Sequence, residues 1–218
     1  MIRYVATLLF AFSAVALGAS GNISKVNSSI RVDDGGQAGD VSTVNGSITI
    51  GRNASVREVD TVNGSIRLDE RARAESVETV NGGVTLGEGV LVSEDVSAVN
   101  GKLTVRRGAR VGGRLENVNG EFLLEGATVG GGIETVNGDI VVGAGSRVDG
   151  GVTVEDSNSW KWRAKSRNPR LTIESGAVVN GPLRFEREVD LYLGDGAVIG
   201  PVEGVEPRRY TIGVADAG

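Results

Sequence analysis

The sequence contains no cysteine and no histidine, and its only aromatic residues are two Trp, three Tyr and four Phe. Because no disulfide can form, packing and hydrogen bonding must stabilise the chain alone. The absence of histidine excludes Ser/His and Cys/His nucleophile systems and every zinc site that contains histidine. Few aromatic residues beside 34 glycines indicate a narrow interior with many corners, not the core of a typical β-sandwich.

Long apolar runs are also missing beyond the N-terminus. Val5–Leu17 is apolar, follows the basic start Met1-Ile2-Arg3 and precedes small residues at Leu17-Gly18-Ala19. This pattern predicts a secretory signal peptide at residues 1–19 and no transmembrane segment in the mature protein. The chain has 23 basic and 28 acidic residues, which argues against binding to nucleic acid.

The sequence is dominated instead by a repeated tripeptide, Val-Asn-Gly, at intervals of 18 or 19 residues. A degenerate copy, Val26-Asn27-Ser28, stands one interval before the first. The six full copies begin at Val44, Val62, Val80, Val99, Val118 and Val136. A fixed period of this size is typical of a solenoid, in which coils stack on one another.

Apolar residues within each repeat have the spacing of β-strands. Ile48 and Ile50 stand two apart, whereas Val44, Ile50 and Val56 stand six apart. Three sides of six residues predict a triangular coil, each side being a strand of about four or five residues. We expect the Val of the tripeptide to point into the core and the preceding Thr43 and its equivalents to point outward.

The Asn-Gly pair predicts a corner, because both residues tolerate positive φ. In stacked coils the asparagines would lie about 4.8 Å apart and hydrogen-bond along the stack. The predicted structural ladder consists of Asn45, Asn63, Asn81, Asn100, Asn119 and Asn137. The sequence therefore predicts an all-β, single-stranded β-helix (β-solenoid) of about nine coils of 18–19 residues, with three short strands per coil. The solenoid domain is expected at 22–205 and a C-terminal tail at 206–218.

Two irregularities interrupt the repeat. The spacing between Leu124 and Val129 is one residue shorter than in neighbouring coils, and residues 157–169 are inserted before Leu171. The insertion interleaves both tryptophans with cations, a combination that suits sugar, phosphate or carboxylate groups, although packing on the rod is the plainer interpretation. The candidate ligand-binding residues are Trp160, Lys161, Trp162, Arg163, Lys165 and Arg167.

A column of acidic residues permits another interpretation. Asp60, Glu78, Glu116 and Glu134 share one offset in the repeat. They indicate either a solvated face or the carboxylates of a carbohydrate-active β-helix, a polysaccharide lyase or hydrolase. An outward row of threonines would instead suit ice binding. Hexapeptide-repeat acyltransferases have a related periodicity but generally use histidine as the base.

The repeats resemble two bacterial groups. Glu58–Ile66 and Glu78–Val84 are similar to an exported adhesin-type β-strand-repeat family with VNG repeats and a largely undefined role. The corners Glu125–Gly131 and Gly194–Gly200 look like those of bactofilins, which are polymer-forming β-helical proteins. Both resemblances imply a β-helix, and neither brings a catalytic residue to this chain.

Together these observations predict an exported, non-enzymatic β-solenoid of the bacterial cell envelope, either periplasmic or on the cell surface. We expect a structural or adhesin-like module that needs no cofactor and no metal. Its expected partners are envelope polysaccharide, anionic lipid or another protein, and end-to-end self-association stays open. The alternatives are a carbohydrate-active β-helix, an ice-binding protein and a bactofilin-like polymer.

Overall fold

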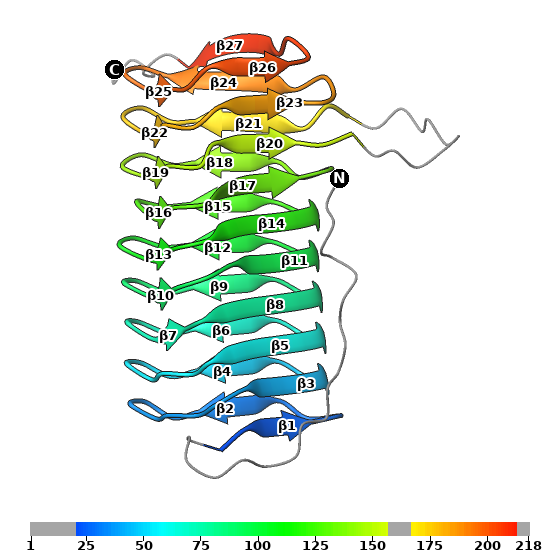
Figure 1. The fold of residues 1–218 in the computed structure, drawn as a ribbon, viewed down its shortest axis with the longest axis vertical. Helices are drawn as coiled ribbons and strands as arrows, with labels where there is room; N and C mark the ends of the chain where they lie inside the picture. Colours follow the sequence, from blue (N-terminus) through cyan, green and yellow to red (C-terminus); the bar gives the residue numbers. More distant parts are fainter. Residues whose placement is uncertain (1–20, 157–166, 213–218) are drawn as a thin grey trace, which may run out of the picture.

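The computed structural model describes residues 21–156 and 167–212, which wind coil upon coil into a β-solenoid (Figure 1). The strands of successive coils pair in parallel, in three sheets that form the three sides of the rod. The predicted fold class, about nine coils with three strands per coil, is confirmed. The expected signal peptide at 1–19 lies outside the described residues.

Sheets A and B each contain ten strands, and sheet C contains seven. Sheet A consists of β1 (Ile23–Lys25), β3 (Val41–Asn45), β5 (Glu58–Asn63), β8 (Ser76–Asn81), β11 (Val96–Asn100), β14 (Arg114–Asn119), β17 (Gly132–Thr135), β20 (Val152–Val154), β23 (Leu183–Phe185) and β26 (Val202–Gly204). Sheet B consists of β2 (Ile30–Val32), β4 (Ile48–Ile50), β6 (Ile66–Leu68), β9 (Val84–Leu86), β12 (Leu103–Val105), β15 (Phe122–Leu124), β18 (Ile140–Val142), β21 (Arg170–Ile173), β24 (Asp190–Gly194) and β27 (Arg208–Ile212). Sheet C consists of β7 (Arg73–Ala74), β10 (Leu91–Val92), β13 (Arg110–Val111), β16 (Thr128–Val129), β19 (Arg147–Val148), β22 (Val178–Val179) and β25 (Val198–Ile199).

The three sides are less equal than the sequence analysis predicts. Half of the strands of sheet A have five or six residues, but most in sheet B have three and those in sheet C have two. The difference arises because the corner between sheets B and C contains a residue with positive φ, such as Asn53 at 53° or Gly89 at 65°. That turn leaves few extended residues for the third side.

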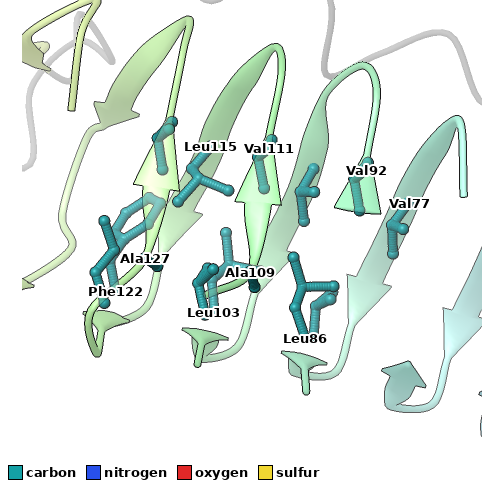
Figure 2. Packing of buried hydrophobic residues seen from close by; sticks show 14 of the residues in the cluster. Val77, Leu86, Val92, Leu103, Ala109, Val111, Leu115, Phe122 and Ala127 are labelled. Carbon is teal, nitrogen blue, oxygen red and sulfur yellow. The ribbon is translucent and has the colours of Figure 1, made fainter. Parts of the chain in front are cut away.

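One continuous apolar core runs along the rod. Figure 2 shows side chains from all three sheets meeting inside it, among them Val77 of sheet A, Leu103 and Phe122 of sheet B, and Val111 of sheet C. Leu103 and Phe122 are in register on neighbouring coils, and both are almost completely buried. Burial of such side chains contributes about 1.5–3 kcal/mol each, so stacking supplies stability that disulfides provide elsewhere.

The structure reverses one prediction about this core. Val44 is half-buried on the outer face of sheet A, whereas Thr43 points inward and is 1% exposed. The alternation of β3 from the buried Val41 requires this arrangement. Burial of the hydroxyl is tolerated because Thr43 Oγ1 donates to the carbonyl of Ser28 at 3.0 Å, and Thr61 Oγ1 does so to Gly46 at 3.0 Å.

Because the threonine side chains of this column are buried, they cannot form the outward row that ice binding requires. The column changes at Ala98 and Asn117, which occupy adjacent coils. Asn117 Nδ2 donates to the carbonyl of Gly101 at 2.5 Å, as the threonine hydroxyls do to other corners. Its larger amide lies beside the small Ala98 methyl, so the pair keeps the interior filled.

The C-terminal end of the rod extends beyond the predicted boundary at 205. Strand β27 pairs with β24 over five residue pairs, from Asp190–Arg208 to Gly194–Ile212. Part of the expected tail therefore belongs to sheet B. In the described part of the chain, no helix is long and apolar enough to cross a membrane.

Candidate functional site

The insertion leaves the solenoid at the corner between sheets A and B, after β20 and before β21. In earlier coils this corner carries the Asn-Gly pair. Of the six predicted ligand-binding residues, Trp160, Lys161, Trp162, Arg163 and Lys165 lie outside the described residues. Arg167 is described, and the structure therefore defines where the insertion begins and ends.

The asparagine ladder occupies the same corner in the coils that precede the insertion. Each side-chain amide donates from Nδ2 to the Oδ1 atom of the asparagine one coil earlier, over 2.8–3.2 Å. These bonds link Asn45 to Asn27, Asn63 to Asn45, Asn81 to Asn63, Asn100 to Asn81, Asn119 to Asn100 and Asn137 to Asn119. The ladder thus ends one coil before the insertion.

A cation from a later coil closes this ladder. Arg187 Nη1 donates to Asn137 Oδ1 at 2.8 Å and to the Val136 carbonyl at 3.4 Å. The register of sheet A aligns Thr135 with Val154 and Val154 with Phe185. Arg187 therefore reaches across the coil that carries the insertion and ties the two flanking coils together.

Both ends of the insertion are held by carboxylates of neighbouring coils. The backbone N–H of Asp156 donates to Glu186 Oε2 at 3.1 Å. On the other side, Asp139 accepts from Arg167 Nη2 at 2.6 Å and from the N–H of Arg170 at 2.9 Å. Arg167 therefore forms an ion pair with Asp139, although the Arg167 side chain is 67% exposed.

Two tyrosines and an arginine lie beside the second end of the insertion, on the outer face of sheet B. The rings of Tyr192 and Tyr210 stack with centroids 4.6 Å apart at 14°, and the guanidinium of Arg170 lies 5.0 Å from the Tyr192 centroid. This pair of tyrosines was not predicted from the sequence. The signal was present, because the two residues are 18 apart, one period of the repeat.

Glu188 extends the same surface. Its Oε2 atom accepts from Asn168 Nδ2 at 3.3 Å and from Arg208 Nη2 at 3.2 Å. The surface around the second end of the insertion therefore combines aromatic rings with cations that are oriented by carboxylates. Such a surface is suited to anionic groups that are attached to an apolar or sugar framework.

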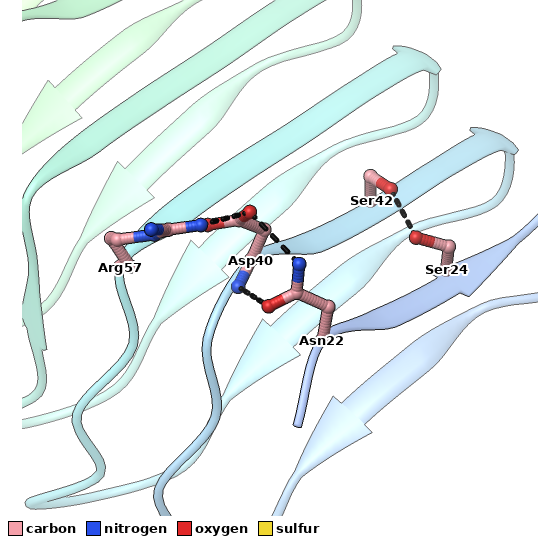
Figure 3. Close-up of polar contacts among 5 residues, drawn as sticks. All are labelled: Asn22, Ser24, Asp40, Ser42 and Arg57. Carbon is pink, nitrogen blue, oxygen red and sulfur yellow. Dashed lines mark hydrogen bonds and ion pairs between the residues drawn. The ribbon is translucent and has the colours of Figure 1, made fainter. Parts of the chain in front are cut away.

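The acidic column forms a second candidate site, on the outer face of sheet A. Asp60 is in register with Glu78 on one side and with Ser42 on the other. Figure 3 shows the end of this face, where Ser24 and Ser42 share a hydrogen bond of 2.9 Å and Asp40 contacts Asn22 and Arg57.

Burial favours the protonated form of three carboxylates in this column. Burial, assisted by the charge of Glu78, raises the pKa of Asp60 to about 7. Burial also raises the pKa of Glu78 and of Glu116. Arg114 Nη1 lies 3.7 Å from Glu116 and 3.3 Å from Glu134, so the distal half of the column has a cationic partner. Asp60 can therefore hold a proton close to neutral pH.

Among the described residues, no group of three or more His, Cys, Asp or Glu side chains is arranged to hold a metal ion. Comparisons with protein-family models, with curated proteins and with solved structures found no match.

Proposed function

We propose that the protein is an exported, non-enzymatic β-solenoid of the bacterial cell envelope that presents the insertion at 157–169 as its binding element. The observation that carries this proposal is the attachment of both ends of the insertion to carboxylates of rigid coils. Export is supported by the expected signal peptide at 1–19 and by the resemblance of the repeats to an exported adhesin-type family.

A rigid attachment favours binding because it lowers the conformational entropy lost on association. Asp139 fixes one end through two hydrogen bonds, and Glu186 fixes the other through one. The coils are joined by three parallel sheets, which give these carboxylates fixed positions. Repeat scaffolds carry function on loops of this kind, where insertion does not disturb stacking.

The ligand we propose is an anionic polysaccharide of the envelope. Aromatic rings bind sugar faces and arginines bind carboxylate or phosphate, and the insertion supplies both residue types. Tyr192, Tyr210 and Arg170 continue the same chemistry on the adjacent outer face of sheet B. The whole chain has a net charge of −5 even though the insertion is rich in cations. The remainder of the rod is therefore acidic and would repel such a ligand.

The test compares binding of purified envelope polysaccharide by four proteins. These are the wild type, a variant with a ten-residue Gly/Ser sequence in place of 157–166, Trp160→Ala/Trp162→Ala, and Asp139→Asn. We expect wild-type binding that salt weakens, loss of binding in the first two variants, and reduced affinity in Asp139→Asn, whose loop sequence is unchanged.

Arg52→Ala serves as the matched control, because it removes an exposed cation far from the insertion. Equal binding by the wild type and the Gly/Ser variant would refute the proposal. If the protein bound vesicles of anionic phospholipid but not the polysaccharide, the ligand would be a membrane surface and not the polysaccharide. Electron microscopy of the same samples reports whether the rods associate end to end.

The raised pKa of Asp60 supports one alternative, a carbohydrate-active β-helix. A protonated Asp60 beside Glu78 would supply an acid and a carboxylate on one face. Release of reducing ends from the polysaccharide by the wild type, abolished in Asp60→Asn, would establish this activity. Polysaccharide binding without release supports the binding module.

A further inference from the structure

The glycine that follows each ladder asparagine donates its backbone N–H to the next coil, with two exceptions. Gly46, Gly64, Gly82 and Gly101 donate to the backbone carbonyls of Asn63, Asn81, Asn100 and Asn119, over 2.9–3.2 Å. Gly138 N–H donates within its own coil, to the buried hydroxyl of Thr135 at 2.9 Å. Within residues 21–156 and 167–212, Gly120 N–H has no hydrogen-bond acceptor. The corner is therefore open between the coil of Asn119 and the coil that follows it.

The strands of sheet A explain this opening. Strand β14 extends to Asn119, but its neighbour β17 ends at Thr135, so the two strands pair only as far as Asn117 and Thr135. Between β11 and β14 the pairing reaches Asn100 and Asn119. The hydroxyl of Thr135 accepts from its own coil, whereas those of earlier threonines in the same column donate to the coil before. This pair of coils thus lacks the glycine bond that the four preceding pairs have.

An asparagine followed by glycine is chemically labile, because glycine has no side chain to hinder its backbone nitrogen. That nitrogen attacks Cγ of the asparagine, so a bond forms between Cγ and the nitrogen while the Cγ–Nδ2 bond breaks. The glycine N–H proton leaves with Nδ2 as ammonia, and a neutral succinimide ring results. Water then opens the ring at either carbonyl and gives aspartate or isoaspartate. A hydrogen bond from the glycine N–H slows the first step, because the nitrogen must lose that proton to react.

The side chains of the ladder do not single out one asparagine in the same way. Each amide from Asn45 to Asn119 donates from Nδ2 and accepts at Oδ1. Asn137 is held more firmly, because its Oδ1 atom accepts from the guanidinium of Arg187 at 2.8 Å. The N–H of the following glycine is therefore the feature in which Asn119 differs from the other asparagines of the ladder.

One further Asn-Gly pair, Asn180-Gly181, lies at the corner between sheets C and A. Gly181 N–H also has no acceptor in the part of the chain that the structure describes. Asn180 Nδ2, however, donates to Asp149 Oδ1 at 2.6 Å, and a bond to a carboxylate is about twice as strong as one between neutral groups. The side chain must leave that bond before Cγ can reach the backbone nitrogen, so Asn180 is protected where Asn119 is not.

We propose that Asn119 is a site of spontaneous deamidation and the fastest-reacting asparagine of the folded protein. The carboxylate formed at this position cannot donate to Asn100 Oδ1, so the reaction cuts the amide ladder between these two coils. Isoaspartate also lengthens the main chain at a crowded corner, where Gly120 lies against the Gly101 carbonyl. The modification concerns the rod itself and does not depend on the proposed binding function.

The experiment incubates the full-length protein in mildly alkaline buffer and measures conversion at each asparagine by peptide mapping with mass spectrometry. The same measurement in urea gives the rates in the unfolded chain, and the ratio of the two rates gives the protection by the fold. We expect protection at Asn119 to be about fivefold smaller than at the four asparagines whose glycine is bonded to the next coil, the effect of one ordinary hydrogen bond. Hydrogen exchange followed by NMR should show the Gly120 amide exchanging faster than that of Gly82.

A variant tests whether the glycine hydrogen bond is what protects an asparagine. Thr135→Val removes the hydroxyl that accepts from Gly138 N–H and keeps the shape of the side chain. It should increase the rate at Asn137 about fivefold. Circular dichroism reports whether the variant is folded, and an unchanged rate at Asn137 in the folded variant would contradict the proposal. The rates and the amide exchange of the wild type test it without any substitution.

Thr79→Val is the matched control. It removes a hydroxyl from the same column, one that donates to the Gly64 carbonyl, and it leaves the bond from Gly82 N–H in place. The rate at Asn81 should therefore stay as in the wild type. Equal protection of all the Asn-Gly pairs, faster conversion at any asparagine other than Asn119, or slow exchange of the amide that follows Asn119 would overturn the proposal.

Discussion

The pKa of Asp60 leads to a prediction that stability decreases as the pH rises from about 4 to about 7. Burial and the neighbouring charge of Glu78 raise this pKa from its ordinary value of 3.8 to about 7. Between these values the native protein holds a proton that the unfolded chain releases. The unfolded state is therefore favoured increasingly as the pH rises, because a raised carboxyl pKa destabilises the ionised native state.

The size of the effect follows from the shift. One pKa unit corresponds to 1.36 kcal/mol, so a shift of about three units amounts to about 4 kcal/mol at full ionisation. Asp60→Asn keeps the shape of the side chain and removes the charge. We expect this variant to match the wild type near pH 4 and to be more stable by about 3–4 kcal/mol near pH 8.

The measurement is urea unfolding followed by far-UV circular dichroism at several pH values between 4 and 8. A ¹³C titration of the Asp60 carboxyl in the folded protein gives its pKa directly. Asp195→Asn, which alters an exposed carboxylate at a corner, is the control and should change stability only slightly. If the Asp60→Asn and wild-type curves were parallel across the whole range, the burial argument for Asp60 would be wrong.

Three further substitutions test the solenoid itself, each by thermal or urea unfolding. Ala98→Asp should be destabilising by several kcal/mol because it buries a charge, whereas Val99→Asp, on the outer face of the same strand, should cost much less; equal losses would contradict the inward and outward assignment. Asn100→Ala removes one rung of the amide ladder and should cost about 1–3 kcal/mol. Gly120→Ala places a Cβ atom 1.8 Å from the Gly101 carbonyl oxygen and should distort the corner enough to lower the melting temperature more than Asn100→Ala does.

The repeat period made most of the fold predictable. Its 18- and 19-residue spacing set the number of coils, and the Asn-Gly pairs placed a corner in each. The register that aligns Asn45 with Asn63 followed from the same spacing. These features depend on local chain geometry that repeats without change, which is why the sequence was sufficient for them.

Which residues of each sheet A strand point into the core was harder to predict. Six-residue spacing placed Val44 inside, but strand alternation from Val41 places Thr43 there. A buried threonine is stable only because the Ser28 carbonyl of the preceding coil accepts its hydroxyl. That partner is known only after the coils have been stacked, so the correct choice needed the three-dimensional structure.

The candidate sites depend even more on stacking. Asp139 and Arg167 are 28 residues apart and meet because the insertion returns to the coil after the one that carries Asp139. The pKa of Asp60 likewise depends partly on the charge of Glu78, which lies one coil further along the rod. The stacked tyrosines could have been predicted from their spacing. Among the candidate sites, only the insertion could be recognised from its composition.

The asparagine ladder has a direction. Every amide donates toward Asn27, so the side-chain dipoles point the same way and polarise one another along the rod. The row accordingly has a positive end at Asn27 and a negative end at the Asn137 oxygen, as a helix does at its two termini. Arg187 lies at that negative end and neutralises it, which makes the ladder a polar filament of amides closed by one cation. Val-Asn-Gly coils added before Asn137 would keep both this polarity and the contact with Arg187, whereas an asparagine added one coil after Asn137 would keep the polarity but take the place of Arg187 at the Asn137 oxygen.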